Sequence, residues 1–456
     1  MAQDSPIPAG RPPRGPLAAG SFGSFVHAAR RRGELVVQPR MGFSSPAAMR
    51  RGLLATRNAA ATTAGTITLD SFTRTGDDRS AMAAVARGDE LNGYPIVAHG
   101  PDVTRAVLDG IRDDTFPVQV RHGSARPQEI FRALIMSGLD ATEGGPVSYC
   151  LPYGRSPLRD SVRAWGESCE MLADGRRSDA EPHLEVFGGC MMGQLCPPGL
   201  LVALSLLEGL FFREHGMRSI SLSYAQQTHP GQDELAVAAL AALAGELLGD
   251  VDWHITVYTY MGVFPRTPHG ARLLGESAAR LAKRSGAARL IVKTAAESLR
   301  IPTVEENVDA LESAAAASVE PGPSSPPRAV GNQVLAEARA LAEAVLGLHP
   351  DIGSALVLAF ERGVLDVPFC LHPDNPRRAL SYLDDDGWLR WSDIGAMPIG
   401  GVAEVSERRR MTSRDLLSAL TYVERKYDAL PPPRSAGSLD EPDRARPSHR
   451  LLSAKE

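Results

Sequence analysis

The sequence has few of the residues on which small cross-linked or metal-bound folds depend. Only five of its 456 residues are cysteine, and no two of them form a Cys-x-x-Cys pair. A disulfide framework and a structural zinc site are therefore not expected, and the thiols are interpreted as reduced. The net charge at pH 7 is only −5, which indicates neither a nucleic acid nor an anionic membrane as a partner.

Long apolar segments and several common catalytic motifs are also missing from the sequence. No apolar run is long enough to cross a bilayer, and the Pro-, Gly- and Ala-rich start lacks the continuous apolar stretch of a signal peptide. There is no Gly-x-Gly-x-x-Gly loop opening a strand–helix unit, no phosphate-binding loop, no His-Glu-x-x-His and no Gly-x-Ser-x-Gly motif. We expect a cytoplasmic protein with no metal site of its own.

Composition divides the chain into four regions. Residues 1–22 are predicted to be a disordered leader, and residues 430–456, rich in Pro, Arg, Asp and Ser, a disordered tail. Residues 23–305 are predicted to form the catalytic domain. Residues 306–429 are predicted to be a helical C-terminal region, interrupted by a flexible Pro- and Ser-rich insertion at 318–328.

Short apolar runs alternate with helical patterns through the catalytic domain. The strand candidates are Glu34–Gln38, Gly65–Leu69, Tyr94–Ala98, Pro117–Val120, Val147–Leu151, Leu184–Phe187, Ser219–Ser223, His254–Tyr258 and Leu290–Val292. Strands separated by amphipathic helices favour a parallel sheet, and their number favours an α/β TIM barrel with an N-terminal extension. Nine candidates exceed eight strands, so Tyr94–Ala98 or Val147–Leu151 is expected to be an accessory segment.

Two helices are expected in the C-terminal region. Helical spacing covers Val334–Leu346 and Arg414–Tyr427, and Ser413 is the predicted N-cap of the second helix.

Arginines follow three of the strand candidates. Arg40, Arg74 and Arg121 come after the first, second and fourth apolar runs. The C-terminal strand ends of a TIM barrel form its active site, so three guanidinium groups would meet at one mouth. Each can bind a carboxylate through two hydrogen bonds, and together they repel one another unless an anion lies among them. The simplest ligand is a dicarboxylate; the alternative is a surface salt bridge at each strand end.

Two further segments contain candidate binding residues. In the glycine-rich stretch from Thr142, Glu143 could receive a substrate ammonium, and Tyr149 and Tyr153 could donate hydrogen bonds to carboxylate oxygens. The alternative is an ordinary loop with half-buried tyrosines. At the last strand end, Lys293 and Glu297 are four residues apart, so a helix start would bring them together. The alternative there is an intrahelical ion pair.

Several stretches match one known family in order and spacing. They are Gln38-Pro-Arg-Met-Gly, Thr68-Leu-Asp-Ser-Phe-Thr-Arg, Leu91-Asn-Gly-Tyr-Pro, Gln119-Val-Arg-His-Gly, Glu143-Gly-Gly-Pro-Val-Ser-Tyr, Leu151-Pro-Tyr, Val292-Lys-Thr-Ala-Ala-Glu, Ile301-Pro-Thr and Phe360-Glu-Arg-Gly-Val-Leu-Asp-Val-Pro-Phe. With these stretches the chain resembles the glutamate mutase (methylaspartate mutase) epsilon subunit across almost all of its predicted ordered length.

The resemblance implies a role for each candidate residue. Arg40, Arg74 and Arg121 match the arginines that hold the two substrate carboxylates, and Glu143 matches the glutamate that contacts the substrate amino group. Tyr149 and Tyr153 match tyrosines of the substrate site. The positions matching the surroundings of the cofactor are Gly42, Thr68, Asn92 and Phe187, with Lys293 and Glu297 near the adenosyl ribose.

The resemblance also implies the chemistry. In this family the barrel stacks on adenosylcobalamin, whose deoxyadenosyl radical takes hydrogen from L-glutamate. The substrate radical splits into a glycyl radical and acrylate, which recombine as the 3-methylaspartate radical. The cofactor performs the difficult step, while the protein positions and shields the radicals.

A separate cobalamin-binding chain is expected. The Asp-x-His-x-x-Gly motif that accompanies histidine ligation of cobalt is absent at every histidine of this sequence. The lower cobalt ligand would therefore come from a small subunit, and family resemblance implies two copies of each subunit.

Three segments depart from the family pattern, and two other functions stay open. The departures are at 188–196, 223–229 and 254–264, where contacts to the cofactor or the docked subunit are expected to differ. One alternative is a relative acting on another amino diacid. The other is a non-catalytic scaffold or regulatory homologue.

Overall fold

Eight short parallel strands form the centre of the computed structural model, which describes residues 21–152, 154–177, 180–191, 195–319, 332–406 and 411–431. The strands are β1 (Val36–Pro39), β2 (Gly65–Thr68), β3 (Val118–Arg121), β4 (Ala141–Gly144), β5 (His183–Val186), β6 (Ser219–Ala225), β7 (Asp252–Tyr258) and β8 (Arg289–Val292). Their order in the sheet is β1-β8-β7-β6-β5-β4-β3-β2.

The sheet closes on itself between β1 and β2. The amide of Val37 donates to the carbonyl of Thr62 at 2.9 Å, and the amide of Ala64 donates to the carbonyl of Val37 at 3.4 Å. Sequential order, parallel pairing and closure are the features of a TIM barrel, so the predicted fold class is confirmed.

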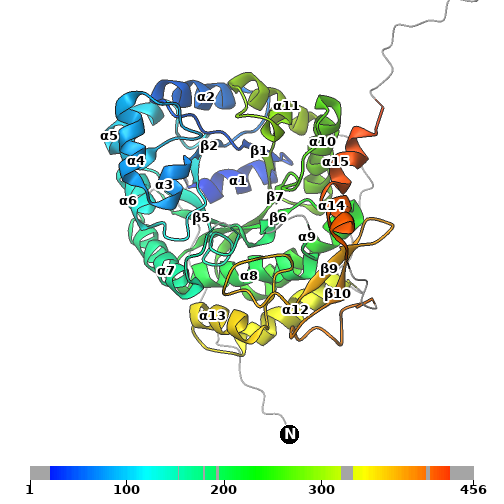
Figure 1. Ribbon diagram of the computed structural model, residues 1–456. Helices are drawn as coiled ribbons and strands as arrows, with labels where there is room; N and C mark the ends of the chain where they lie inside the picture. The colour runs from blue at the N-terminus through cyan, green and yellow to red at the C-terminus, as the bar shows by residue number, and fades with distance from the viewer. Residues whose placement is uncertain are drawn as a thin grey trace, which may run out of the picture.

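Helices surround the barrel (Figure 1). They are α2 (Pro46–Asn58), α3 (Ser71–Thr75), α4 (Asp78–Arg87), α5 (Ile96–Leu108), α6 (Gln128–Met136), α7 (Leu158–Asp174), α8 (Pro198–Glu214), α9 (Pro230–Leu247), α10 (Pro268–Ser285) and α11 (Val304–Val319). Local signals set their ends: in α10, the side chain of Thr267 accepts the amide of Gly270, and the helix stops at Gly286 with φ of 76°. Within the described residues, no helix has both the length and the apolar character that a membrane span requires.

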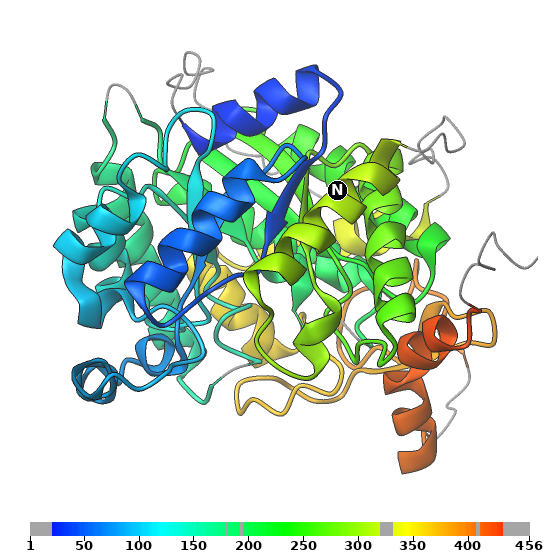
Figure 2. The same ribbon diagram turned by 90° about the horizontal axis from the view of Figure 1, so that it is seen from above.

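A short helix, α1 (Phe22–Arg31), covers the amino-terminal end of the barrel. Figure 2 shows it at one end of the molecule, with α14 at the other. Phe22 is 1% exposed. Its ring stacks on His183 with centroids 4.9 Å apart, and the guanidinium of Arg289 lies 4.8 Å from its centre. The helix therefore seals the polar interior of the barrel from water.

The C-terminal region is only partly helical. It contains α12 (Gln333–Leu346), α13 (Ile352–Arg362), the antiparallel strands β9 (Leu380–Leu383) and β10 (Leu389–Asp393), α14 (Ser413–Leu420) and α15 (Tyr422–Asp428). The prediction of an all-helical region missed this hairpin. The predicted helix over Arg414–Tyr427 is divided at Thr421, and its N-cap is Thr412 rather than Ser413.

Two predicted strands are wrong, and one strand was missed. Tyr94–Ala98 contributes only a bridge from Tyr94 to Leu69 before α5 begins, and Val147–Leu151 forms turns. The remaining strand is Ala141–Gly144, whose glutamate and glycine resemble a loop in sequence, although all four residues are buried. Burial between two neighbouring strands overrides the weak local preference.

The predicted domain boundaries stay predictions. Helix α11 spans the expected boundary at 305 and packs against α2 and α10 in the helical ring. Residues 1–20, 320–331 and 432–456, which make up most of the predicted leader, insertion and tail, lie outside the described residues.

Removing the aromatic ring that seals the barrel should weaken the whole fold. We expect Phe22→Ala to lower the free energy of unfolding by about 3–5 kcal/mol, because it leaves a cavity beside His183 and Arg289. Arg31→Ala, an exposed position of the same helix, is the control and should change it by less than about 0.5 kcal/mol. Urea unfolding curves of the three proteins measure the difference; equal midpoints would contradict the sealing role.

Candidate active site

The three predicted arginines lie at the carboxyl-terminal end of three neighbouring strands. Arg40 directly follows β1, Arg74 is in the last turn of α3 after β2, and Arg121 ends β3. Arg74 and Arg121 both act electrostatically on His122, the residue that follows β3. The structure thus gathers the arginines on one face, as parallel strands whose carboxyl ends share an edge require.

A buried ion pair forms the centre of the site. Nη2 of Arg121 lies 3.0 Å from Oε2 of Glu143, and their side chains are 4% and 1% exposed. The hydroxyl of Tyr258 donates to Oε2 of Glu143 at 2.8 Å, and the hydroxyl of Tyr149 donates to Oε1. Burial opposes the charge of Arg121, but the Glu143 carboxylate raises the pKa of Arg121 above its ordinary value. Arg121 is therefore charged at neutral pH.

Two buried donors beside this pair have no protein acceptor. Among the described residues, neither Nη1 of Arg121 nor Nε2 of His122 has a hydrogen-bond partner. Burial, followed by the charges of Arg74 and Arg121, lowers the pKa of His122 to about 3, so the ring is neutral. Its Nδ1 accepts the amide of Ser124 at 3.2 Å, which leaves the proton on Nε2. Buried donors without partners are costly, so this corner is built to receive an anionic acceptor.

A second polar layer lies deeper in the barrel, and sequence reasoning did not find it. Glu185 on β5 accepts hydrogen bonds from Arg289 on β8 and from the hydroxyl of Tyr258. Arg289 also donates to Gln119 at 3.1 Å. The hydroxyl of Tyr258 thus bridges Glu185 below and Glu143 above. The available signal was a charged residue inside each of two otherwise apolar strands.

The residues assigned to the adenosyl side lie at the end of β8. Glu297 accepts a hydrogen bond from Nη1 of Arg40 at 3.1 Å, so its carboxylate pairs with the arginine cluster instead of forming an intrahelical pair with Lys293. The amine of Lys293 lies 4.4 Å from the ring centre of Phe264 and donates to the carbonyl of Tyr260 at 3.4 Å. Lys293, Glu297 and Arg40 thus all lie at the carboxyl-terminal rim of the barrel.

Three other predicted contacts are structural neighbours of the arginines. A side chain at Gly42 would clash with the carbonyl of Thr68, so only glycine fits there. The hydroxyl of Thr68 is buried without a partner among the described residues. Asn92 accepts the amide of Ser71 at 2.9 Å and donates to its hydroxyl at 2.6 Å, and that hydroxyl also accepts a hydrogen bond from Arg74 at 3.0 Å. Asn92 therefore anchors the helix that carries Arg74.

Of the last two predicted residues, Phe187 lies within the described part of the chain and Tyr153 does not. Phe187 is 3% exposed. Its ring lies 5.0 Å from Tyr149 and 5.6 Å from Tyr258, so it forms a wall of the ion-pair site. Tyr153 lies outside the described residues.

The segments that depart from the family pattern make internal contacts. A side chain at Gly189 would clash with the carbonyl of Ser223. Gln226 accepts the amide of Tyr260 at 3.3 Å, and the hydroxyl of Thr228 donates to the carbonyl of Gly387 at 2.7 Å. The ends of β5, β6 and β7 are thus joined to one another and to the β9–β10 hairpin. Residues 192–194 lie outside the described residues.

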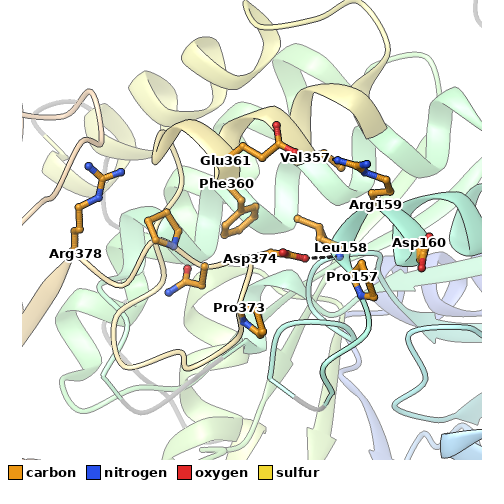
Figure 3. Close-up of a pocket in the computed structure, with 12 residues that line it drawn as sticks. Pro157, Leu158, Arg159, Asp160, Val357, Phe360, Glu361, Pro373, Asp374 and Arg378 are labelled. Atoms are coloured by element: carbon orange, nitrogen blue, oxygen red, sulfur yellow. Dashed lines mark hydrogen bonds and ion pairs between the residues drawn. The ribbon is translucent and has the colours of Figure 1, made fainter.

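A cavity of about 550 Å³ lies apart from these residues, between the start of α7, α13 and the loop at 373–378 (Figure 3). Asp374 crosses it and accepts the amide of Leu158 at 2.7 Å. None of the predicted site residues that the structure describes lines this cavity.

The buried amine at the rim should make the stability of the protein depend on pH. Burial lowers the pKa of Lys293 from 10.5 to about 8. Below pH 8 the amine is charged in the folded and the unfolded protein, and its burial lowers the free energy of unfolding by the full amount. This loss shrinks as pH rises from 8 towards the pKa of the lysine in the unfolded chain. We expect Lys293→Met to melt at a higher temperature than the wild type at pH 7, and the gap to narrow by pH 10.

Melting curves at pH 7, 8, 9 and 10 measure this gap. Lys283→Met, at an exposed lysine of α10, is the control and should show no such pH trend. A Lys293→Met protein that melts below the wild type at pH 7 would contradict the burial cost.

Known proteins share this sequence over most of its length. The family model of the methylaspartate mutase E chain (MutE) matches residues 18–419. The glutamate mutase epsilon subunit of Escherichia coli O157:H7 is 31% identical over 354 residues, covering 73% of this chain and 72% of the relative. That of Halobacterium salinarum is 31% identical over 362 residues, covering 76% and 75%.

A solved structure of a phosphonomutase-like protein from Burkholderia cenocepacia aligns with 59% of this chain and 91% of its own, at 13% identity and a TM-score of 0.32, which is too low to bear on function. The family match and the sequence identities do not depend on this structural similarity. The chain belongs to the methylaspartate mutase E chain family.

Proposed function

We propose that this chain is the substrate-binding subunit of an adenosylcobalamin-dependent mutase that interconverts L-glutamate and 3-methylaspartate. The observation that carries the proposal is the buried pair of Arg121 and Glu143, 3.0 Å apart, with two unpaired donors beside it. A cation and an anion side by side complement the carboxylate and the ammonium of an α-amino acid. Family membership supplies the reaction class, a mutase.

The chain's own residues would bind and orient the amino diacid. Arg121 keeps its ion pair with Glu143 and offers Nη1 to a carboxylate, which Nε2 of His122 can also reach as a donor. Glu143 receives the substrate ammonium and in that sense is the catalytic residue in contact with substrate. Arg74 and Arg40, on the neighbouring strand ends, would hold the second carboxylate.

The rim residues fit a nucleoside-bearing cofactor. The buried hydroxyl of Thr68 lacks a partner among the described residues, and Lys293 and Glu297 place a donor and an acceptor at the end of β8. Gly42, Thr68, Asn92, Phe187, Lys293 and Glu297 are the residues proposed to border the cofactor. When bound, adenosylcobalamin supplies the radical that removes hydrogen from the substrate. Helix α1 closes the amino-terminal end of the barrel, opposite to the site, and a cofactor bound at the open end would shield that step from water there.

The cobalt is proposed to take its lower ligand from a separate small cobalamin-binding subunit, with two copies of each chain in the assembly. The direct test mixes this chain with that subunit, adenosylcobalamin and L-glutamate, and follows 3-methylaspartate by proton NMR. We expect product only when all components are present. Turnover by this chain without the subunit would refute the partner, and turnover of another amino diacid in place of glutamate would reassign the substrate.

The bidentate hydrogen bonding of the arginine is expected to matter more than its charge. Arg121→Lys keeps the charge but loses the planar donor fork, so we expect kcat/KM for glutamate to fall by about 10- to 150-fold. Arg126→Lys, at an arginine whose side chain is 59% exposed, is the matched control and should leave it unchanged. Steady-state kinetics of the reconstituted enzyme give the answer, and wild-type values for Arg121→Lys would remove the arginine from the substrate site.

A further inference from the structure

A buried carboxylate on α8 takes no direct part in the site described above. Glu208 is 0% exposed in a helix whose neighbouring residues, such as Leu204 and Phe211, are apolar and equally buried. A carboxylate in such surroundings destabilises the fold unless donors compensate it. The described cations form no ion pair with Glu208; its surroundings offer hydrogen bonds instead. Its presence therefore needs a structural or functional reason.

Three hydrogen bonds to Glu208 come from the loop after β4. Oε1 accepts the amides of Val147 and Ser148, both at 2.9 Å, and Oε2 accepts the hydroxyl of Ser148 at 2.8 Å. These amides begin the tight turn in which the amide of Tyr149 bonds to the carbonyl of Gly145 at 3.1 Å. The carboxylate thus caps the turn and determines where the next residue, Tyr149, lies.

Two glycines make room for this carboxylate. A side chain at Gly145, in the loop after β4, would clash with the carboxylate of Glu208. A side chain at Gly188, in the loop after β5, would come within 2.9 Å of Oε2. One carboxylate therefore holds both loops that border the ion pair: the first carries Tyr149, and the second follows Phe187, whose rings lie 5.0 Å apart.

We propose that Glu208 is a positioning residue of the amino-acid site, which holds Tyr149 so that its hydroxyl orients the Glu143 carboxylate toward the substrate ammonium. This inference rests on the proposed function. Glu208 does not touch the substrate; it acts through the turn at Val147 and Ser148 and through the Tyr149 to Glu143 hydrogen bond. Burial raises the pKa of Glu208 to about 7, and the hydrogen bonds from the turn partly oppose that rise.

The proposal predicts that loss of Glu208 affects ligands with an amino group more than ligands without one. If Glu208 only supported the fold, its loss would weaken the binding of every ligand alike. If it orients Glu143, its loss should weaken the binding of amino diacids while sparing glutarate, the dicarboxylate of the same length without the amino group. The ratio of KM for L-glutamate to Ki for glutarate therefore separates the two roles.

The test uses the reconstituted enzyme with Glu208→Met, which keeps the length and removes both acceptor oxygens. We expect KM for glutamate to rise about 10- to 100-fold and Ki for glutarate to change less than about threefold, as the loss of hydrogen bonds to one charged group implies. Glu208→Gln, whose carbonyl oxygen can still accept the two amides, should restore most of the affinity for glutamate. Equal changes in the two constants, or wild-type values for Glu208→Met, would overturn the proposal.

A second variant disturbs the contact between Glu208 and the loop after β4 by changing the loop instead of the carboxylate. Gly145→Ala pushes a methyl group against the carboxylate, and we expect the same selective rise in KM for glutamate. Gly245→Ala is the matched control, because a side chain there meets no atom within 4 Å. If Glu208→Met does not fold, the Gly145→Ala constants decide: a selective rise supports the proposal, and wild-type or equally changed constants overturn it.

Hydrogen exchange tests the contact without any activity. The amides of Val147 and Ser148 should exchange at least about tenfold faster in Glu208→Met than in the wild type, because they lose a charged acceptor. Unchanged exchange would overturn the proposal even in an active enzyme. A wild type that binds neither glutamate nor glutarate would instead refute the proposed function, so the two failures are distinguishable.

Discussion

The ion pair between Arg121 and Glu143 is the interaction on which the arrangement of the site depends. Two opposite charges this deeply buried are tolerated because each lies beside the other, since a charge left alone would stand in a medium of low polarity. The parallel pairing of β3 with β4 places the two residues side by side. Tyr149 and Tyr258 complete the coordination of the carboxylate. The free edge of the arginine then faces the place where an anion is expected.

The polar groups of the barrel interior form two ion pairs that are joined by a tyrosine hydroxyl. Arg289 pairs with Glu185 near the sealed end, Tyr258 links Glu185 to Glu143, and Glu143 pairs with Arg121 at the open end. Each charged group in this chain of contacts therefore lies beside a group of opposite charge. The covering helix α1 belongs to the same system, because the guanidinium of Arg289 lies against the ring of Phe22. The seal of one end and the chemistry of the other are thereby physically connected.

The C-terminal region is joined to the barrel through the segment after β6. Gln232 donates to the carbonyl of Leu389 at 2.9 Å and accepts its amide at 3.0 Å, as a strand would. Thr228 bonds to Gly387 in the same hairpin. Thr228 and Gln232 therefore join the β9–β10 hairpin to the barrel, which accounts for their polar character in a buried place.

Local sequence determined seven of the eight barrel strands and the positions of Arg40, Arg74 and Arg121. Apolar runs separated by helical spacing identify strands, and polar residues that follow them must lie at one end of a parallel barrel. The same reasoning assigned Glu143 to a loop, since only pairing on both sides makes Ala141–Gly144 a strand. The partners of Glu185 and Glu208 could not be read locally: Arg289 is 104 residues from Glu185, and Val147 is 61 residues from Glu208. Sequence spacing encodes which face of an element is apolar, whereas the closure of the barrel alone decides which distant polar groups meet inside it.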